Sequence, residues 1–158
     1  MTIEENKALI AKYPFLIPRW RWDLTIPEDY DYSYTELDAM PDGWRKAFGE
    51  QLCQELLAAL GEDDDVHSYR ILQVKEKDGF LHWEDCGASK KAHAVIQKYC
   101  DMSWRICMVC GKPATRVLAH SYSPYCVDCI PVFHGVPHVN YPIEDYPLVK
   151  IKHEDKGE

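Results

Sequence analysis

Four cysteines in the C-terminal half of the chain have the spacing of a metal site. Cys107 and Cys110 form one Cys-x-x-Cys pair, and Cys126 and Cys129 form a second pair after fifteen intervening residues. Zinc prefers four ligands in a tetrahedron, and thiolates satisfy that geometry well. Gly111, directly after the first pair, favours a tight turn that aims two sulfurs at one ion. The pattern predicts a structural zinc site, because four thiolates leave no coordination position for water.

Two helices and a hairpin are expected to position this quartet. Apolar side chains recur every four residues over 44–60, which predicts a helix, and Gly61 is placed to end it. An Asp-Gly pair at 78–79 predicts a tight turn between strands 69–75 and 80–84. Residues 89–103 return to helical spacing and lead into the first cysteine pair. The predicted fold class is α+β, with helices packed on a small antiparallel hairpin and a C-terminal zinc-ribbon lobe.

The N-terminal third predicts a short helix and an irregular arm. Residues 2–12 favour a helix that ends before Pro14, and 13–22 favour an extended segment across the core. Residues 26–43 interleave acids and tyrosines without a firm period. They fit a surface wrap with half-buried tyrosines, or an acidic, aromatic recognition surface that imitates phosphate and base. The predicted divisions are an α+β core with this arm at 1–104, the zinc ribbon at 105–130 and a Pro/His/Tyr-rich segment at 131–158.

Charge is distributed unevenly along the chain. The formal net charge is −8, and residues 1–43 hold four basic and nine acidic side chains. Phosphate is repelled by such a surface, so broad nucleic-acid binding is disfavoured. A local basic contact surface near the zinc and the hairpin turn remains open as a hypothesis. Its candidate members are Lys75, Lys77, Arg105, Lys112 and Arg116.

Composition sets the expected compartment. Apolar runs are far shorter than the roughly 20 residues that cross a bilayer, and no secretory signal pattern opens the chain. Four of the seven cysteines have metal spacing, which favours a reducing compartment. A cytoplasmic protein is therefore expected. Cys53, Cys86 and Cys100 are predicted to be buried thiols, because free cysteine packs like a small apolar side chain.

The sequence partly matches the motifs of two zinc enzyme classes, but each match is incomplete. Zinc deaminases carry H-x-E before P-C-x-x-C, and His82 and Glu84 supply the first part, but Tyr125 separates the proline from the cysteine in the second. A zinc-stapled nuclease would need an acidic residue beside the histidine between the cysteine pairs, which is missing. His134 and His138 could bind a second metal. The prediction is a protein without enzymatic activity.

The hairpin and ribbon together resemble a known family. The segment "QVKEKDGFLHW" (73–83), a helix and "RICMVCGKPATR" (105–116) resemble a recurrent, largely uncharacterised family of small phage and bacterial proteins. Those proteins place a K-E-K-F-G-x-L hairpin before a helix and a C-x-x-C-G-x-P zinc ribbon, and "MPDGWRKAFG" (40–49) also resembles them. Asp78 stands where the family has an aromatic residue, and His82 where it has a basic one. The resemblance implies a phage or prophage setting, and hence the cytoplasm of a bacterial host cell.

Two functions follow as hypotheses. The leading one is a non-enzymatic zinc-ribbon binding protein of phage or prophage type. It would engage a host or phage protein through the acidic aromatic surface, with inhibition of that partner as one form of the hypothesis. The alternative is a nucleic-acid-binding or processing accessory that uses the basic residues of the ribbon and hairpin. Neither version involves a membrane.

Overall fold

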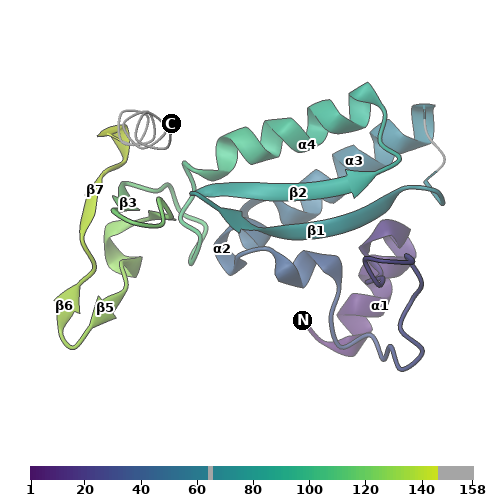
Figure 1. Ribbon diagram of the computed structural model, residues 1–158, viewed down its shortest axis with the longest axis horizontal. Coiled ribbons are helices and arrows are strands. Elements are labelled where there is room, and N and C mark those ends of the chain that lie inside the picture. The colour runs from purple at the N-terminus through teal and green to yellow at the C-terminus, as the bar shows by residue number, and fades with distance from the viewer. Residues whose placement is uncertain (64–65, 146–158) are drawn as a thin grey trace.

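The centre of the fold is a two-stranded antiparallel hairpin in the computed structural model, which describes residues 1–63 and 66–145. Strands β1 (Arg70–Lys77) and β2 (Phe80–Cys86) pair across the predicted Asp-Gly turn, with an irregularity between Ile71 and Gln73. Helices α3 and α4 run along one side of the hairpin, and α1 lies on the other (Figure 1). The prediction of helices on a small antiparallel hairpin is confirmed.

The register separates the two faces of the hairpin. Val74 pairs with Trp83 and Glu76 pairs with Leu81, so these side chains share one face. Lys75 pairs with His82 and Lys77 with Phe80, on the other face. The two lysines and the glutamate at this end of the hairpin therefore lie on opposite faces.

One continuous helical segment supplies most of the core. It comprises α2 (Asp42–Trp44), a π-helical stretch (Arg45–Gly49) and α3 (Glu50–Asp63). The predicted apolar stripe is buried along its whole length: Trp44, Phe48, Leu52, Leu56 and Leu60. The prediction that Gly61 ends the helix is wrong, because α3 continues to Asp63.

Helix α4 (Lys90–Ser103) closes the outer edge of β2. Ser89 caps its start by accepting a hydrogen bond from the Ala92 N–H. At the other end, the Ser103 hydroxyl accepts a hydrogen bond from the Leu81 N–H (2.8 Å) and donates to the Cys100 carbonyl (2.7 Å). The Leu81 N–H at the edge of β2, which has no neighbouring strand among the described residues, is thereby paired with a helix side chain.

The thiols outside the quartet occupy two environments. Cys53 is fully buried in α3, as predicted, whereas Cys86 and Cys100 are only partly buried. Burial raises the pKa of Cys53 to about 12 and that of Cys100 to about 11. Both groups are therefore protonated thiols at neutral pH.

The N-terminal segment begins as predicted and then folds more tightly than predicted. Helix α1 (Ile3–Lys12) starts at a capping box in which Thr2 and Glu5 exchange hydrogen bonds. A 3₁₀ turn at Pro14–Leu16 buries Phe15 and Leu16 and replaces part of the extended segment expected at 13–22. A second 3₁₀ turn at Glu36–Ala39 carries the chain into α2.

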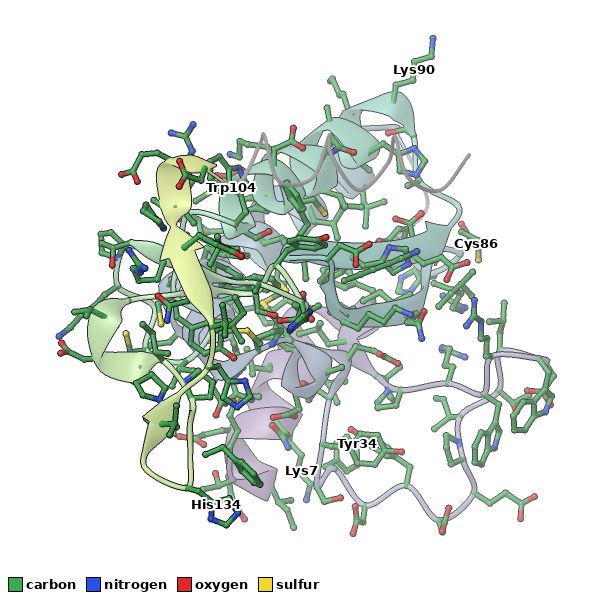
Figure 2. The ribbon with its side chains drawn as sticks, turned by 60° about the vertical axis from the view of Figure 1, so that its left-hand side comes forward. Lys7, Tyr34, Cys86, Lys90, Trp104 and His134 are labelled. Carbon is green, nitrogen blue, oxygen red and sulfur yellow. The ribbon has the colours of Figure 1, made fainter. Side chains whose placement is uncertain are left out.

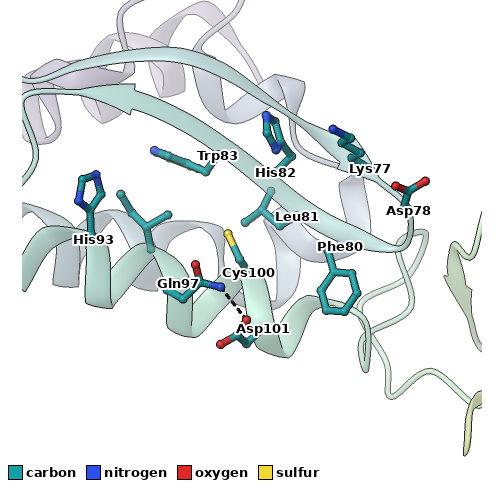
Figure 3. A pocket seen from close by; sticks show the side chains of 11 residues that line it. Lys77, Asp78, Phe80, Leu81, His82, Trp83, His93, Gln97, Cys100 and Asp101 are labelled. Atoms are coloured by element: carbon teal, nitrogen blue, oxygen red, sulfur yellow. Dashed lines mark hydrogen bonds between the residues drawn. The ribbon is translucent and has the colours of Figure 1, made fainter. Parts of the chain in front are cut away.

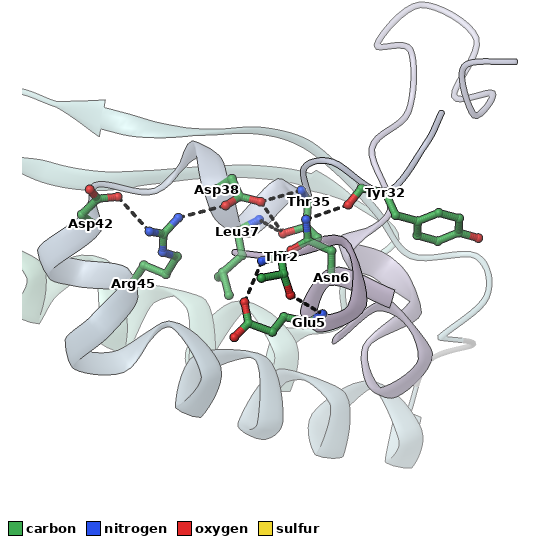
Figure 4. Close-up of polar contacts among 9 residues, drawn as sticks. All are labelled: Thr2, Glu5, Asn6, Tyr32, Thr35, Leu37, Asp38, Asp42 and Arg45. Carbon is green, nitrogen blue, oxygen red and sulfur yellow. Dashed lines mark hydrogen bonds and ion pairs between the residues drawn. The ribbon is translucent and has the colours of Figure 1, made fainter. Parts of the chain in front are cut away.

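Hydrogen bonds lock this N-terminal segment to the core (Figure 4). The fully buried Asn6 donates from its amide to the Tyr32 carbonyl (2.8 Å). Arg45 binds Asp38 (3.0 Å) and Asp42 (2.9 Å), and Asp38 accepts a hydrogen bond from the Thr35 N–H (2.7 Å). The end of the irregular segment is thus fixed to both α1 and the start of the long helical segment.

Short strands follow α4. Strands β3 (Arg116–Leu118), β4 (Pro124–Tyr125) and β7 (Asn140–Pro142) form one sheet in the order β4-β3-β7. Strands β5 (Val132–Phe133) and β6 (Val136–Pro137) form a projecting hairpin, with His134 near its tip (Figure 2). Two 3₁₀ turns, Val127–Cys129 and Ile143–Asp145, complete the described part. Residues 146–158 of the predicted C-terminal segment lie outside the described residues.

Candidate functional site

Two tight turns bring the four cysteines together. In the first, the Cys107 N–H donates to the Lys112 carbonyl (2.8 Å) and the Gly111 N–H donates to the Cys107 carbonyl (3.0 Å). Gly111 has φ = +80°, which a residue with a side chain adopts only with strain. In the second, the Cys129 N–H donates to the Cys126 carbonyl (3.1 Å).

The sulfur geometry fits a tetrahedral metal. The ligand atoms of Cys107, Cys110, Cys126 and Cys129 all lie within 4.8 Å of one another. The Cys110 and Cys126 sulfurs are 3.6 Å apart, far longer than a disulfide bond of about 2.05 Å. Four sulfurs at about 2.3 Å from a central Zn²⁺ would be separated by about 3.8 Å. The quartet is a plausible metal site.

The thiols of the quartet differ in how readily they ionise. The Lys112 backbone N–H points at the Cys110 sulfur and lowers the pKa of that thiol to about 7. The neighbouring Cys126 raises the pKa of Cys129 to about 12. Four adjacent thiolates repel one another, so ionisation of the whole quartet requires a positive ion among the sulfurs.

The first cysteine turn is packed directly on the core. Gly43 donates its N–H to the Met108 carbonyl (2.8 Å), and the Trp44 indole N–H donates to the Ile106 carbonyl (2.8 Å). A Cβ atom added at Gly43 would lie 2.1 Å from the Cys107 carbonyl oxygen. One added at Gly111 would lie 2.7 Å from the Gly43 carbonyl oxygen. The cysteine site and the buried helical segment therefore share a backbone contact that only glycine permits.

The five predicted basic contact residues have different surroundings. Lys75, Lys77 and Lys112 are exposed. Arg105 is also exposed and lies over the Trp104 ring, 4.8 Å from its centroid. Arg116 is partly buried and donates to the Asn140 side chain (2.6 Å) and carbonyl (3.3 Å), which ties β3 to β7. The Arg116 guanidinium is thus engaged within the protein.

The residues of the two rejected enzyme patterns are also placed. His82 lies 4.0 Å from Glu84, but Glu84 is held by Arg21 at 2.8 Å. Within residues 1–63 and 66–145, the cysteine quartet is the only group of three or more His, Cys, Asp or Glu residues with metal-binding geometry. His134 and His138 belong to no such group in that part of the chain.

A buried polar network beside β2 was not predicted. The Trp83 indole N–H donates to the Tyr69 hydroxyl (2.9 Å), which donates to Asp85 (3.1 Å). The other Asp85 oxygen lies 3.2 Å from His93 Nε2. The Asp85 side chain is 4% exposed and the His93 side chain 61%. Its four residues lie on β2, on α4 and directly before β1, so no local spacing in the sequence could have revealed it.

His93 lies on the wall of a cleft of about 560 Å³ between β2 and α4 (Figure 3). Apolar side chains of Leu81, Trp83 and Ile96 line it together with His82 and Cys100. The protonated Cys100 thiol is a poor nucleophile. The hydrogen bonds of the network join β2 and α4 to Tyr69, the residue directly before β1.

Tyr69→Phe should lower the free energy of unfolding by about 2–3 kcal/mol, because it leaves two buried polar groups, on Trp83 and Asp85, without their partner. Urea unfolding followed by far-UV circular dichroism measures this. The matched control is Tyr34→Phe, at a largely exposed ring, which should change stability little. Equal stabilities of the two variants would contradict a role for the network.

The irregular N-terminal segment presents aromatic rings to solvent. The Trp20 and Trp22 rings stack with centroids 4.7 Å apart and planes 17° apart, and the residues are 45% and 75% exposed. Tyr30 packs against Tyr32 and Tyr34 with centroids 4.9 and 5.5 Å apart. We call residues 20–34 the aromatic arm. They hold four acidic residues and one basic residue, Arg21.

Glu36 fixes the chain where it enters the aromatic arm. Its carboxylate accepts the backbone N–H of Arg19, and burial raises its pKa to about 7 from the usual 4.5. A raised folded-state pKa favours folding most below about pH 4.5, and this contribution is lost as the pH rises through about 7.

Glu36→Gln should therefore raise the free energy of unfolding at pH 8 by about 1–2 kcal/mol, with little gain at pH 4.5. The amide oxygen can still accept the Arg19 N–H. Urea unfolding of wild type and variant at both values of pH measures the difference. A gain of equal size at both would contradict the shifted pKa.

No family model matches this chain, and no curated protein or solved structure gives a significant match. Among the helices of the described part, none combines the length and the apolar character that a bilayer crossing requires.

Proposed function

We propose that this chain is a non-enzymatic binding protein that engages a protein partner through its aromatic arm. The observation that carries the proposal is the exposed tryptophan stack, Trp20 on Trp22, in a segment rich in carboxylates. Large exposed aromatic side chains are enriched at protein interfaces and often dominate their binding energy. The phage or prophage setting and action as an inhibitor belong to the same proposal.

In this proposal the metal is zinc, in a ribbon-like lobe, and its role is structural. The support is the all-thiolate donor set, which suits zinc and leaves no open coordination position. Because Gly43 contacts the backbone of the first cysteine turn, the ion would also stabilise the packing of that turn on the core. The ion would hold that turn against the long helical segment, which follows the aromatic arm in the chain.

Nucleic-acid binding is the second candidate and has less support. Lys75, Lys77 and Lys112 are exposed, which such a surface requires. Arg116, however, is engaged with Asn140, and the net charge of −8 repels phosphate.

Capture from bacterial lysate on immobilised protein, with and without nuclease, separates the two candidates. The proposal expects the same protein to be retained after nuclease treatment, with retention that weakens only moderately between 50 and 300 mM salt. Capture that disappears with nuclease, or that falls steeply with salt, would overturn it in favour of phosphate contacts.

A further inference from the structure

A groove of about 470 Å³ lies beside the tryptophan stack of the aromatic arm. Its lining combines aromatic, apolar and acidic side chains and contains no basic residue. The lining residues are Trp20, Trp22, Asp23, Thr25, Ile26, Glu28 and Asp29.

The stack leaves an aromatic face available to a ligand. One face of the Trp22 ring is covered by Trp20, yet the residue as a whole is 75% exposed. The opposite face must therefore be open to solvent. An open indole face attracts cations, because its π-electrons give it a negative potential.

Arg19 and Arg21, the arginines adjacent to the groove residues in sequence, bind groups outside the groove's carboxylates. Arg19 donates to the Leu24 carbonyl (2.9 Å), and Arg21 binds Glu84 on β2 (2.8 Å). Hydrogen bonds from the N–H and hydroxyl of Thr25 lower the pKa of Asp23, which keeps that carboxylate ionised. The groove therefore carries net negative charge.

Two backbone hydrogen bonds close the loop that presents the stack. The Trp20 N–H donates to the Thr25 carbonyl (2.8 Å), and the Leu24 N–H donates to the Trp20 carbonyl (2.7 Å). Leu24 has φ = +61°, a strained value for a residue with a side chain.

We propose that this groove binds the guanidinium group of an arginine in a basic segment of the partner. The inference rests on the proposed function, since it names the chemistry of that partner. Arginine fits better than lysine because its planar group stacks on an indole face while its N–H groups bind carboxylates side by side. A basic segment of this kind is common on proteins that bind nucleic acid, which agrees with an arm that imitates phosphate and base.

The test uses a capped pentapeptide with two arginines and follows the indole N–H resonances of the tryptophans by NMR. The same peptide with two lysines, and with two citrullines as neutral isosteres, serves for comparison. The arginine peptide should shift the Trp20 and Trp22 resonances saturably, with an affinity roughly threefold or more above that of the lysine peptide. The citrulline peptide should cause no saturable shift.

Two variants make the test specific. Trp22→Ala should abolish the response of the Trp20 resonance. Phe133→Ala, which removes an equally exposed ring from the β5–β6 hairpin, should leave both resonances responsive. Equal shifts with citrulline and arginine would overturn the inference, as would the absence of any shift.

Failure here can be distinguished from failure of the proposed function. If lysate capture depends on Trp22 but the arginine peptide does not bind, the arm is an interface and the arginine inference is wrong. If the peptide binds but Trp22→Ala leaves capture unchanged, the groove binds cations and the proposed interface is wrong.

Discussion

Removal of the metal is expected to lower the melting temperature of the whole chain, by about 10 °C or more. The reason is the backbone contact between the cysteine turn and the core. Trp44 is fully buried and donates to the carbonyl of Ile106, next to the first ligand, Cys107. Loss of the ion should therefore loosen the helical segment as well as the quartet. Differential scanning calorimetry with and without a zinc chelator measures the effect.

Single substitutions refine this test. Cys107→Ser should reproduce the low melting temperature without chelator, because it removes one of four ligands. Cys86→Ser should melt like wild type and remain sensitive to the chelator, since Cys86 lies outside the quartet. A core transition that stays at the wild-type temperature after the metal is lost would contradict coupling between the two parts.

Gly43→Ala is expected to be among the most damaging small substitutions, with a loss of more than about 3 kcal/mol in the free energy of unfolding. The added Cβ would lie 2.1 Å from the Cys107 oxygen and 2.7 Å from the Gly111 nitrogen, both backbone atoms that cannot simply rotate away. The helix and the cysteine turn must then separate, so zinc content, measured by inductively coupled plasma mass spectrometry, should fall as well.

Gly61→Ala is the matched control for that substitution. Gly61 lies within α3, and a Cβ there would meet nothing within 4 Å. The same change should therefore be neutral or stabilise the helix by up to about 1 kcal/mol. If both alanine variants had similar stability and zinc content, the close approach at Gly43 would not matter.

Local rules of chain geometry predicted the main helices and the β1–β2 hairpin. The four-residue spacing from Trp44 to Leu60 identified a helix because its stripe is buried. The hairpin turn followed from Asp78 and Gly79, which have φ of +50° and +87°. Gly61 misled the prediction, because a glycine without a positive φ requirement does not have to end a helix.

Contacts between distant segments could not be predicted in the same way. Nothing in the local pattern around Gly43 indicates that its neighbour in space is Cys107, 64 positions later. The network of Tyr69, Asp85 and His93 likewise depends on how β1, β2 and α4 pack. The quartet was predictable because the cysteine spacing is local within each pair and a tetrahedral metal site calls for two such pairs.

The aromatic arm is tested most directly by comparing wild type, Trp22→Ala and Phe133→Ala in capture from nuclease-treated lysate, with the retained protein quantified by mass spectrometry. Phe133→Ala should retain the same partner at the wild-type level, while Trp22→Ala should retain at most about a tenth of it, as expected for a central aromatic contact. Zinc content and melting temperature should be the same in all three. Equal capture by Trp22→Ala and wild type would contradict the aromatic arm as the interface.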